Sequence, residues 1–540
     1  MSLETVERTI NERHMLPRWR APNESTAEAT GLKERSASNH RQGWLEQLSG
    51  QFELKPTPFN ARELAETAQV LGHELEPAIV EKMVETGYRQ PRLHQQASDP
   101  PAGYAGINGR LQIGAIRQRL KRDPRQPLAW TELARYYLAD GLQEKAISAM
   151  QGALATAPFN RYVLRSASRL FAQIRDPGRA LHALRRSGMT AHDPWLLSTE
   201  IALQGLQNKT SSNVKTAQRM LEAKSEAPRH LAELAAALGT LEHQNGRHKQ
   251  AKRLFAQCLE DPNENSVAQA VHVARQDSKI QVPEILLERP QNYEAHARQA
   301  YGDGKWETSL NHCVQWHIDE PFDTKPSIIG SCLSFNLELA SRARDIATMG
   351  LRCDPQNELL LNNRAVANAY CGDVTQAWED LQGAIKYEKG QAHLLATLGL
   401  LAYRSGQPDV GLRAYGLSIA WLVQKKERTS AARAYLYWLR ESVRIGSTDG
   451  IKELEEVRKA VSRWPRLEQE SEVRGLIQAV ESELQHRAWE NTEVLLPIRH
   501  QTDFYALQEK IEVPEGAHRV YALISKDDVP EIASADLMSQ

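Results

Sequence analysis

Three side chains of metal-ligating type stand close together in the sequence: His312, Cys313 and His317. Imidazole and thiolate groups hold Zn²⁺ when three or four of them converge on one ion. Their spacing does not place all three on one face of a helix. Cys313 also falls at an apolar position of the surrounding pattern, so we expect a buried cysteine flanked by surface histidines and no metal site.

Adjacent acids at Glu455–Glu456 and Asp527–Asp528 are the candidates for acid–base chemistry. Neighbouring side chains on a helix point in different directions, and acids in a terminal tail are solvated, so neither pair is expected to form a dyad. The chain has no phosphate-binding loop, no His-Glu-x-x-His pair, no Cys-x-x-Cys pair and no nucleophile elbow. The sequence therefore indicates no catalytic residue, no cofactor and no enzyme.

Charge is the clearest local signal. Residues 101–190 hold 15 Lys/Arg against 5 Asp/Glu, a local excess of ten positive charges, although the whole chain has a net charge of -1. A local excess of this kind is available to bind an acidic segment or a phosphate backbone. A solvated basic face, balanced by the acidic residues of the tail, is the simpler interpretation.

Composition restricts the class of protein. The 540 residues are 41% hydrophobic and 25% charged, which is typical of globular proteins. The five cysteines form no Cys-x-x-Cys pair, as in a reducing compartment. The first twenty residues lack the apolar core of a signal peptide, and no apolar run is long enough to span a membrane. We expect a soluble cytoplasmic protein that does not bind membranes.

Proline spacing reveals an internal repeat. Prolines recur at one constant spacing at Pro124 and Pro158, at Pro194, Pro228 and Pro262, and at Pro321 and Pro355. That spacing, about 34 residues, is the period of a two-helix repeat unit. The unit from Pro127 to Asn160 places Trp130, Leu133 and Ala134 on a first helix, and Ala146 on a second.

This unit resembles the tetratricopeptide-repeat family almost position for position. Trp130 stands at the family's large position, Leu133–Ala134 at its Leu–small pair, and Ala146 at the small position of the helix crossing. We expect each proline to end a second helix, because proline cannot continue the hydrogen-bond ladder. About seven or eight units, most of them looser, lie between residues 111 and 424. The resemblance implies an all-α fold, a right-handed α-solenoid of helix-turn-helix repeats.

The chain divides into segments by composition and repeat register. We predict a polar N-terminal segment (1–44), which has an LPRWR anchor and is mobile or docks on the solenoid, then helices (45–88) and a Pro/Gln/Gly linker (89–110). The repeats form a first sub-array (111–262), a degenerate repeat or kink (263–290) and a second sub-array (291–424). Capping helices (425–489) and an acidic tail with β-prone stretches (490–540) follow.

The resemblance also implies where a partner binds. In this family, chosen positions of each first helix line a concave groove, and here they carry Thr131, Arg135, Arg165 and Arg169. Arg165 and Arg169 stand four positions apart and share one face. Paired arginines hold carboxylates or phosphates through two hydrogen bonds. The family's carboxylate clamp uses Lys and Asn at matching positions, so its chaperone-binding function is not carried over.

The leading hypothesis is a non-enzymatic scaffold that binds a partner peptide or helix in this groove, with an acidic segment near the arginines. The acidic tail, roughly 507–540, could occupy the groove in cis. One alternative is a regulatory or assembly subunit of a bacterial-type complex whose enzyme is on another chain. A second alternative is a basic solenoid that binds nucleic acid.

Overall fold

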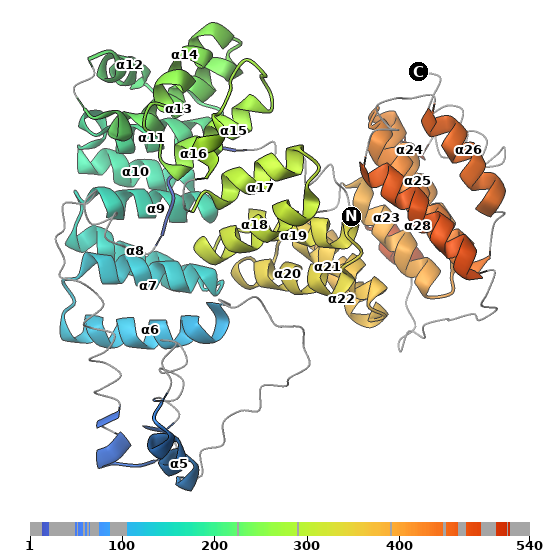
Figure 1. Ribbon diagram of the computed structural model, residues 1–540, viewed down its shortest axis with the longest axis horizontal. Coiled ribbons are helices and arrows are strands. Elements are labelled where there is room, and N and C mark those ends of the chain that lie inside the picture. Colours follow the sequence, from blue (N-terminus) through green and yellow to red (C-terminus); the bar gives the residue numbers. More distant parts are fainter. Residues whose placement is uncertain are drawn as a thin grey trace. The chain divides into compact units, whose positions relative to one another are not determined.

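The structure is a computed structural model of the chain. It describes residues 13–20, 49–50, 52–57, 60–61, 64, 75–86, 105–223, 226–288, 291–388, 391–446, 450–462, 471–487, 504–515 and 517–518. Every regular element in these residues is helical (Figure 1), so the predicted all-α fold is confirmed for them. Of the β-prone stretches 492–500 and 518–526, only His518 is described, and it is helical; the other residues lie outside the described ones. No described helix is both long and apolar enough to cross a membrane.

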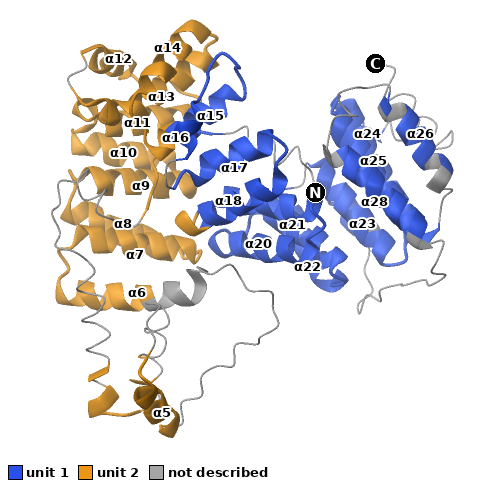
Figure 2. Ribbon diagram, in the orientation of Figure 1, with its two compact units in different colours: residues 1–13, 267–317, 323–540 blue, residues 14–266, 318–322 orange. Residues whose placement is uncertain are grey.

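The chain forms two compact units (Figure 2). Unit 1 comprises residues 1–13, 267–317 and 323–540, and unit 2 comprises residues 14–266 and 318–322. Unit 2 therefore contains a short N-terminal stretch and a brief insertion from later in the sequence, in addition to its run of repeats.

Unit 2 is a stack of helix pairs. After α5 (Pro77–Glu85), its helices are α6 (Ala105–Arg122), α7 (Pro127–Ala139), α8 (Gln143–Thr156), α9 (Arg161–Gln173), α10 (Pro177–Ser187), α11 (Pro194–Leu206), α12 (Val214–Ala223), α13 (Pro228–Gln244) and α14 (His248–Cys258). The first helices α7, α9, α11 and α13 begin at Pro127, Arg161, Pro194 and Pro228, so the repeat keeps a nearly constant period. Each first helix packs against the helix that follows it.

Prolines have two roles at the helix ends. Pro158 follows the end of α8 at Thr156, as predicted. Pro194 and Pro228 instead begin α11 and α13 at the first helical position, so the prediction that they end a preceding helix is wrong. The first turn of a helix tolerates proline, because its missing N–H has no intrahelical partner there. Asp193 caps α11 by accepting from two backbone N–H groups.

Small residues allow the paired helices to approach closely. Ala134 and Ala146 are fully buried in the core between α7 and α8, as the repeat pattern predicts. A Cβ added at Gly152 of α8 would lie 3.0 Å from the Trp130 ring of α7. The large and small positions of the repeat therefore pack against each other across the helix pair.

Unit 1 contains a partial repeat followed by further pairs. Its helices are α15 (Glu264–Ala274, which begins in unit 2), α16 (Glu284–Leu287), α17 (Tyr293–Gly302), α18 (Trp306–Asp319, which ends in unit 2), α19 (Lys325–Asn336), α20 (Ala340–Cys353), α21 (Glu358–Tyr370), α22 (Val374–Tyr387), α23 (Ala392–Arg404), α24 (Pro408–Gln424), α25 (Arg428–Ile445), α26 (Gly450–Ser462), α28 (Ser471–Arg487) and α29 (Phe504–Glu509). In the stretch 263–290, α15 is followed by the single turn α16 in place of a full second helix.

The C-terminal helices of unit 1 close one apolar core. It extends from α19 to α29, and α25 packs on α24 and α28. The described part of the acidic tail belongs to this core, because Leu507 and Ile511 are each 3% exposed and α29 packs on α23 and α24. Residues 519–540 of the tail lie outside the described residues.

Glycines let α23 and α24 approach each other closely. A Cβ on Gly399 would lie 2.5 Å from Cδ2 of Tyr415, and a Cβ on Gly411 would clash with the Tyr403 ring. We predict that Gly399→Ala and Gly411→Ala each lower the free energy of unfolding by about 1–3 kcal/mol, because an overpacked core must shift. Urea unfolding followed by circular dichroism measures the effect.

Gly475→Ala on α28 is the matched control. No atom lies within 4 Å of the position of its Cβ. Alanine there is expected to stabilise the helix by up to about 1 kcal/mol. Equal effects at Gly399 and Gly475 would contradict the proposed close packing of α23 on α24.

Candidate functional site: the N-terminal strap and the side chains that hold it

The four residues predicted to line a groove are all buried in unit 2. Thr131 and Arg135 lie on α7, and Arg165 and Arg169 lie on α9, with exposed fractions of 0%, 8%, 8% and 6%. The Thr131 hydroxyl donates to the Pro127 carbonyl oxygen at 2.8 Å, within its own helix. The Arg135 guanidinium lies over the Tyr136 ring, 5.3 Å from its centroid.

Arg165 is paired with a buried acid of α13. Its two terminal nitrogens donate to the two carboxylate oxygens of Glu233 at 2.8 and 3.0 Å, and its guanidinium stacks 4.7 Å from the Trp195 ring. Asn263 and Asn265 donate to the same carboxylate at 2.8 and 3.3 Å. Burial alone would raise the pKa of Glu233, but Arg165 and the two amides outweigh it and hold this pKa below its usual value.

Arg169 meets an acid that comes from far along the chain. Its Nε lies 3.9 Å from Oε1 of Glu320, and its guanidinium lies 5.3 Å from the centroid of the Phe322 ring. Both partners belong to the stretch 318–322, which is part of unit 2. The shared face of Arg165 and Arg169 is therefore as predicted, while the acids that they meet belong to the chain itself.

An extended N-terminal segment occupies this face. His14–Arg20, which we call the N-terminal strap, has no helical structure, and its odd-numbered residues are buried while its even-numbered residues are half-buried. Met15 is 3% exposed and Trp19 is fully buried. The Trp19 ring lies 5.1 Å from the Phe322 ring and joins the core of unit 2. Alternation with a period of two is the geometry of an extended chain.

Side chains of unit 2 bind the backbone of the strap. Asn265 donates to the Leu16 carbonyl oxygen at 2.9 Å, and the Tyr162 hydroxyl donates to the Arg20 carbonyl oxygen at 2.6 Å. The Trp19 amide donates to Oε1 of Glu320 at 3.2 Å. We call the residues that contact the strap the strap site: Tyr162, Glu264, Asn265, Asp319, Glu320 and Phe322.

Opposite charges complete the contact. Arg18 pairs with Glu320, whose side chain is fully buried. Nε of Arg20 lies 2.6 Å from Oδ2 of Asp319, and its Nη1 lies 3.6 Å from Oε1 of Glu264. Burial and the neighbouring charge of Glu320 raise the pKa of Asp319, and Arg20 opposes this effect. The strap site is therefore an acidic surface matched by the two arginines of the strap.

The sequence predicted that the segment with the LPRWR anchor is mobile or docks on the solenoid, but it did not predict the residues that hold it. The sequence does contain a pattern that indicates an extended chain. Met15, Pro17 and Trp19 stand at every second position, and arginines stand on both sides of Trp19. Asp319 and Glu320 stand just before the repeat proline Pro321, where the sequence pattern indicates only the solvated end of a helix. Only the fold brings them to α9.

The histidine–cysteine cluster has separate local roles in unit 1. Cys313 is 1% exposed, and burial raises its pKa to about 12. His317 forms a hydrogen bond with the Ser327 hydroxyl at 3.2 Å. His312 stacks on His296 with ring centroids 4.6 Å apart. The buried cysteine is as predicted, but His317 is buried as well, so the prediction of a surface histidine is wrong at that position. The hydrogen bond with Ser327 compensates for the burial of its ring.

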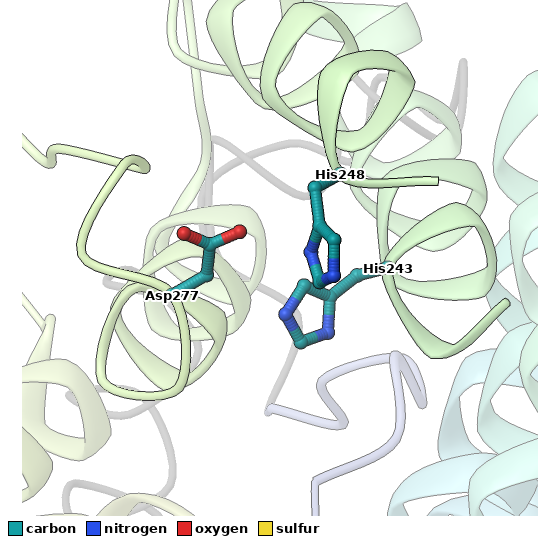
Figure 3. Close-up of side chains that lie close together, drawn as sticks. All are labelled: His243, His248 and Asp277. Atoms are coloured by element: carbon teal, nitrogen blue, oxygen red, sulfur yellow. The ribbon is translucent and has the colours of Figure 1, made fainter. Parts of the chain in front are cut away.

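A second histidine pair lies at the turn between α13 and α14. The rings of His243 and His248 meet edge to face with centroids 5.1 Å apart (Figure 3). Asp277, drawn with them, belongs to unit 1, so no site is built from the three.

Comparisons with known proteins are remote. No family model and no curated protein matches the chain. A solved APC/C hetero-tetramer of Cut9 and Hcn1 is 13% identical over 96% of this chain and 98% of that chain, with a TM-score of 0.30. Yeast Tom70 is 14% identical over 72% and 94%, with a TM-score of 0.28, and the TPR domain of P58(IPK) is 12% identical over 76% and 98%, with a TM-score of 0.23.

Such slight likenesses carry no argument, so the assignment rests on the geometry of the chain. Within each array, successive helix pairs keep a period close to the roughly 34 residues of this repeat type, with small residues where the paired helices cross. In the described residues the chain is a helical-repeat protein, and its helix pairs resemble tetratricopeptide repeats in their period. In this repeat protein, the strap lies on the face formed by first helices.

The Arg165–Glu233 pair supports both the repeat stack and the strap site. We predict that Glu233→Gln lowers the free energy of unfolding of unit 2 by about 3 kcal/mol, because it leaves a buried guanidinium without its counter-ion. Urea unfolding measures this. Glu222→Gln, at an exposed position of α12, is the control and should change stability by less than about 0.5 kcal/mol. Equal effects would show that the pair is not buried as described.

His317 makes stability depend on pH. Burial lowers its pKa to about 4 from an ordinary value of 6.5, so between these values the unfolded state binds a proton that the folded state does not. The free energy of unfolding should therefore fall as pH drops from 7 to 5, by about 2 kcal/mol more in the wild type than in His317→Gln. His182→Gln, at an exposed position, is the control. Equal losses in the wild type and His317→Gln would contradict the burial of a neutral imidazole.

Proposed function

We propose that this repeat protein is a non-enzymatic protein-interaction scaffold, and that the strap site holds an extended segment of a partner. The observation that carries the proposal is the strap itself. The site already binds an extended segment through its backbone. Asn265 and Tyr162 each donate to a carbonyl oxygen of the strap, and the Glu320 carboxylate accepts from the Trp19 amide. Backbone bonds of this kind are available to any extended peptide of suitable side chains.

Arg165 and Arg169 act in this proposal as positioning residues. Arg165 orients Glu233, and Glu233 accepts from Asn265, whose amide group holds the strap. Arg169 lies beside Glu320, which binds the Trp19 amide. Thr131 and Arg135 lie one repeat earlier, on α7. Burial raises the pKa of the Tyr162 hydroxyl, and the positive charge of Arg135 opposes that rise. Arg165 and Arg169 thus lie beside the surface that we assign to the partner, while Thr131 bonds within its own helix.

An acidic partner segment fits this surface less well. It would have to draw Arg165 away from Glu233 and lie beside Glu264, Asp319 and Glu320. The same acids disfavour a phosphate backbone at this face. The alternative hypothesis, a regulatory subunit whose enzyme is on another chain, would use the same kind of contact. The two hypotheses therefore differ in the identity of the partner, and both use the strap site.

The test is an affinity pull-down from the native cell with the full-length chain. The bait is a release variant, Arg18→Glu/Arg20→Glu, compared with the same variant carrying Tyr162→Phe and Asn265→Ala, which remove two bonds to the backbone of the bound segment. We predict a stoichiometric protein that the release variant captures and that the added substitutions reduce at least fivefold.

Glu222→Gln in the release variant is the control and should leave capture unchanged. Capture that does not depend on Tyr162 and Asn265 would place the interface elsewhere. Recovery of nucleic acid alone would favour the basic-solenoid alternative. Circular dichroism of each bait confirms that its helices are intact.

A further inference from the structure

The acids of the strap site carry the inference. Asp319 and Glu320 are adjacent, with side chains 14% and 0% exposed, and Oε1 of Glu264 lies 3.6 Å from Nη1 of Arg20. Two buried carboxylates side by side are costly unless cations compensate them. Arg18 and Arg20 supply that compensation from the strap. Arg169 of the fold also lies 3.9 Å from Glu320, so an occupant with positive charges at alternate positions of its chain completes the compensation of the two acids.

An aromatic side chain between those charges has its own place. Trp19 is fully buried against Phe322, and the Arg169 guanidinium lies over the same Phe322 ring. In an extended chain, successive side chains point to opposite sides, so the tryptophan points into the core while both arginines point toward the acids. Burial of an indole contributes much of the binding energy of a peptide anchor.

The strap is attached in a way that permits exchange. The three bonds to its backbone described above are all made with side chains of the site, and no helix of the fold is broken when the segment leaves. In the sequence, residues 21–76 separate Arg20 from the start of α5 at Pro77. A segment of the same chain competes for the site at a higher effective concentration than a separate molecule does.

We propose that the strap site recognises an extended basic segment of a partner protein with an arginine, an aromatic residue and a second arginine in succession, and that the chain's own residues His14–Arg20 are its intramolecular competitor. This inference rests on the proposed function and adds the chemistry of the partner. The partner segment in this proposal is positively charged. The sequence instead suggested an acidic partner segment, because residues 101–190 are basic.

The experiment measures peptide binding to the full-length chain by fluorescence anisotropy. The probe is a labelled peptide with the sequence of residues 13–20, RHMLPRWR. We predict that it binds the release variant Arg18→Glu/Arg20→Glu at least tenfold more tightly than the wild type, whose own strap competes. Affinity should fall as salt is raised, because ion pairs contribute to it.

Matched peptides and site variants separate charge from shape. Replacing both Arg18 and Arg20 by glutamate in the peptide should weaken binding at least tenfold, and so should replacing Trp19 by alanine. In the protein, Glu320→Gln added to the release variant should weaken the natural peptide by about tenfold but leave a peptide with alanine at position 18 nearly unchanged. Glu222→Gln in the same background is the control.

Equal affinity of the basic and acidic peptides would overturn the inference, and so would equal affinity of the wild type and the release variant. A second variant, with residues 14–20 replaced by a Gly/Ser segment of equal length, guards against an altered site in the first. If neither variant binds the peptide while both retain their helical circular dichroism, the inference fails. Capture of a partner through Tyr162 and Asn265 would still support the proposed function in that case.

Discussion

Buried carboxylates on the first-helix face of unit 2 are the constraint on which the rest of the site depends. A repeat protein buries apolar side chains between neighbouring helices and leaves polar side chains on the face of its first helices. Here Glu233 lies on α13, and Glu320 meets this face from the stretch 318–322; their exposed fractions are 2% and 0%. A charge removed from water needs an opposite charge and hydrogen bonds around it. Arg165 compensates Glu233, and Arg18 of the strap compensates Glu320.

Unit 1 uses the same solution. Arg404 of α23 makes two bonds, at 2.7 and 2.8 Å, with the fully buried Glu441 of α25, and Arg444 lies 3.1 Å from the same carboxylate. Near its start, Arg13 makes two bonds of 3.0 Å with Glu294 of α17. In each unit, therefore, guanidinium–carboxylate pairs join elements that belong to different repeats. Such pairs fix which helices meet, whereas apolar packing alone tolerates several arrangements.

The regular part of the fold could be predicted because its cause is local. A constant proline spacing, a large residue at one position and small residues at the helix crossing all follow from one unit and its copies, as Trp130, Ala134 and Ala146 show. The role of Pro194 and Pro228 was predicted wrongly, because a proline after one helix and a proline at the start of the next differ by only a few positions. The spacing of Arg165 and Arg169 correctly predicted a shared face.

The strap site could not be predicted in the same way. Its members are residues 162, 264–265, 319–320 and 322, and only tertiary structure brings them together with the strap, residues 14–20. An acid next to a repeat proline has no property in the sequence that distinguishes it from a solvated helix end. The arginines were visible as charge, but their partners were not, so the sequence suggested an acidic ligand where we propose a basic one.

Hydrogen exchange at the backbone amides of the strap, followed by mass spectrometry of the full-length chain, tests the central claim most directly. If the strap occupies the site through its matched charges, the Trp19 amide, which donates to Glu320, is protected in the wild type and exchanges much faster in Glu320→Gln. Protection should persist in Glu222→Gln. Exchange of the wild-type Trp19 amide at the rate of a free peptide would contradict the account.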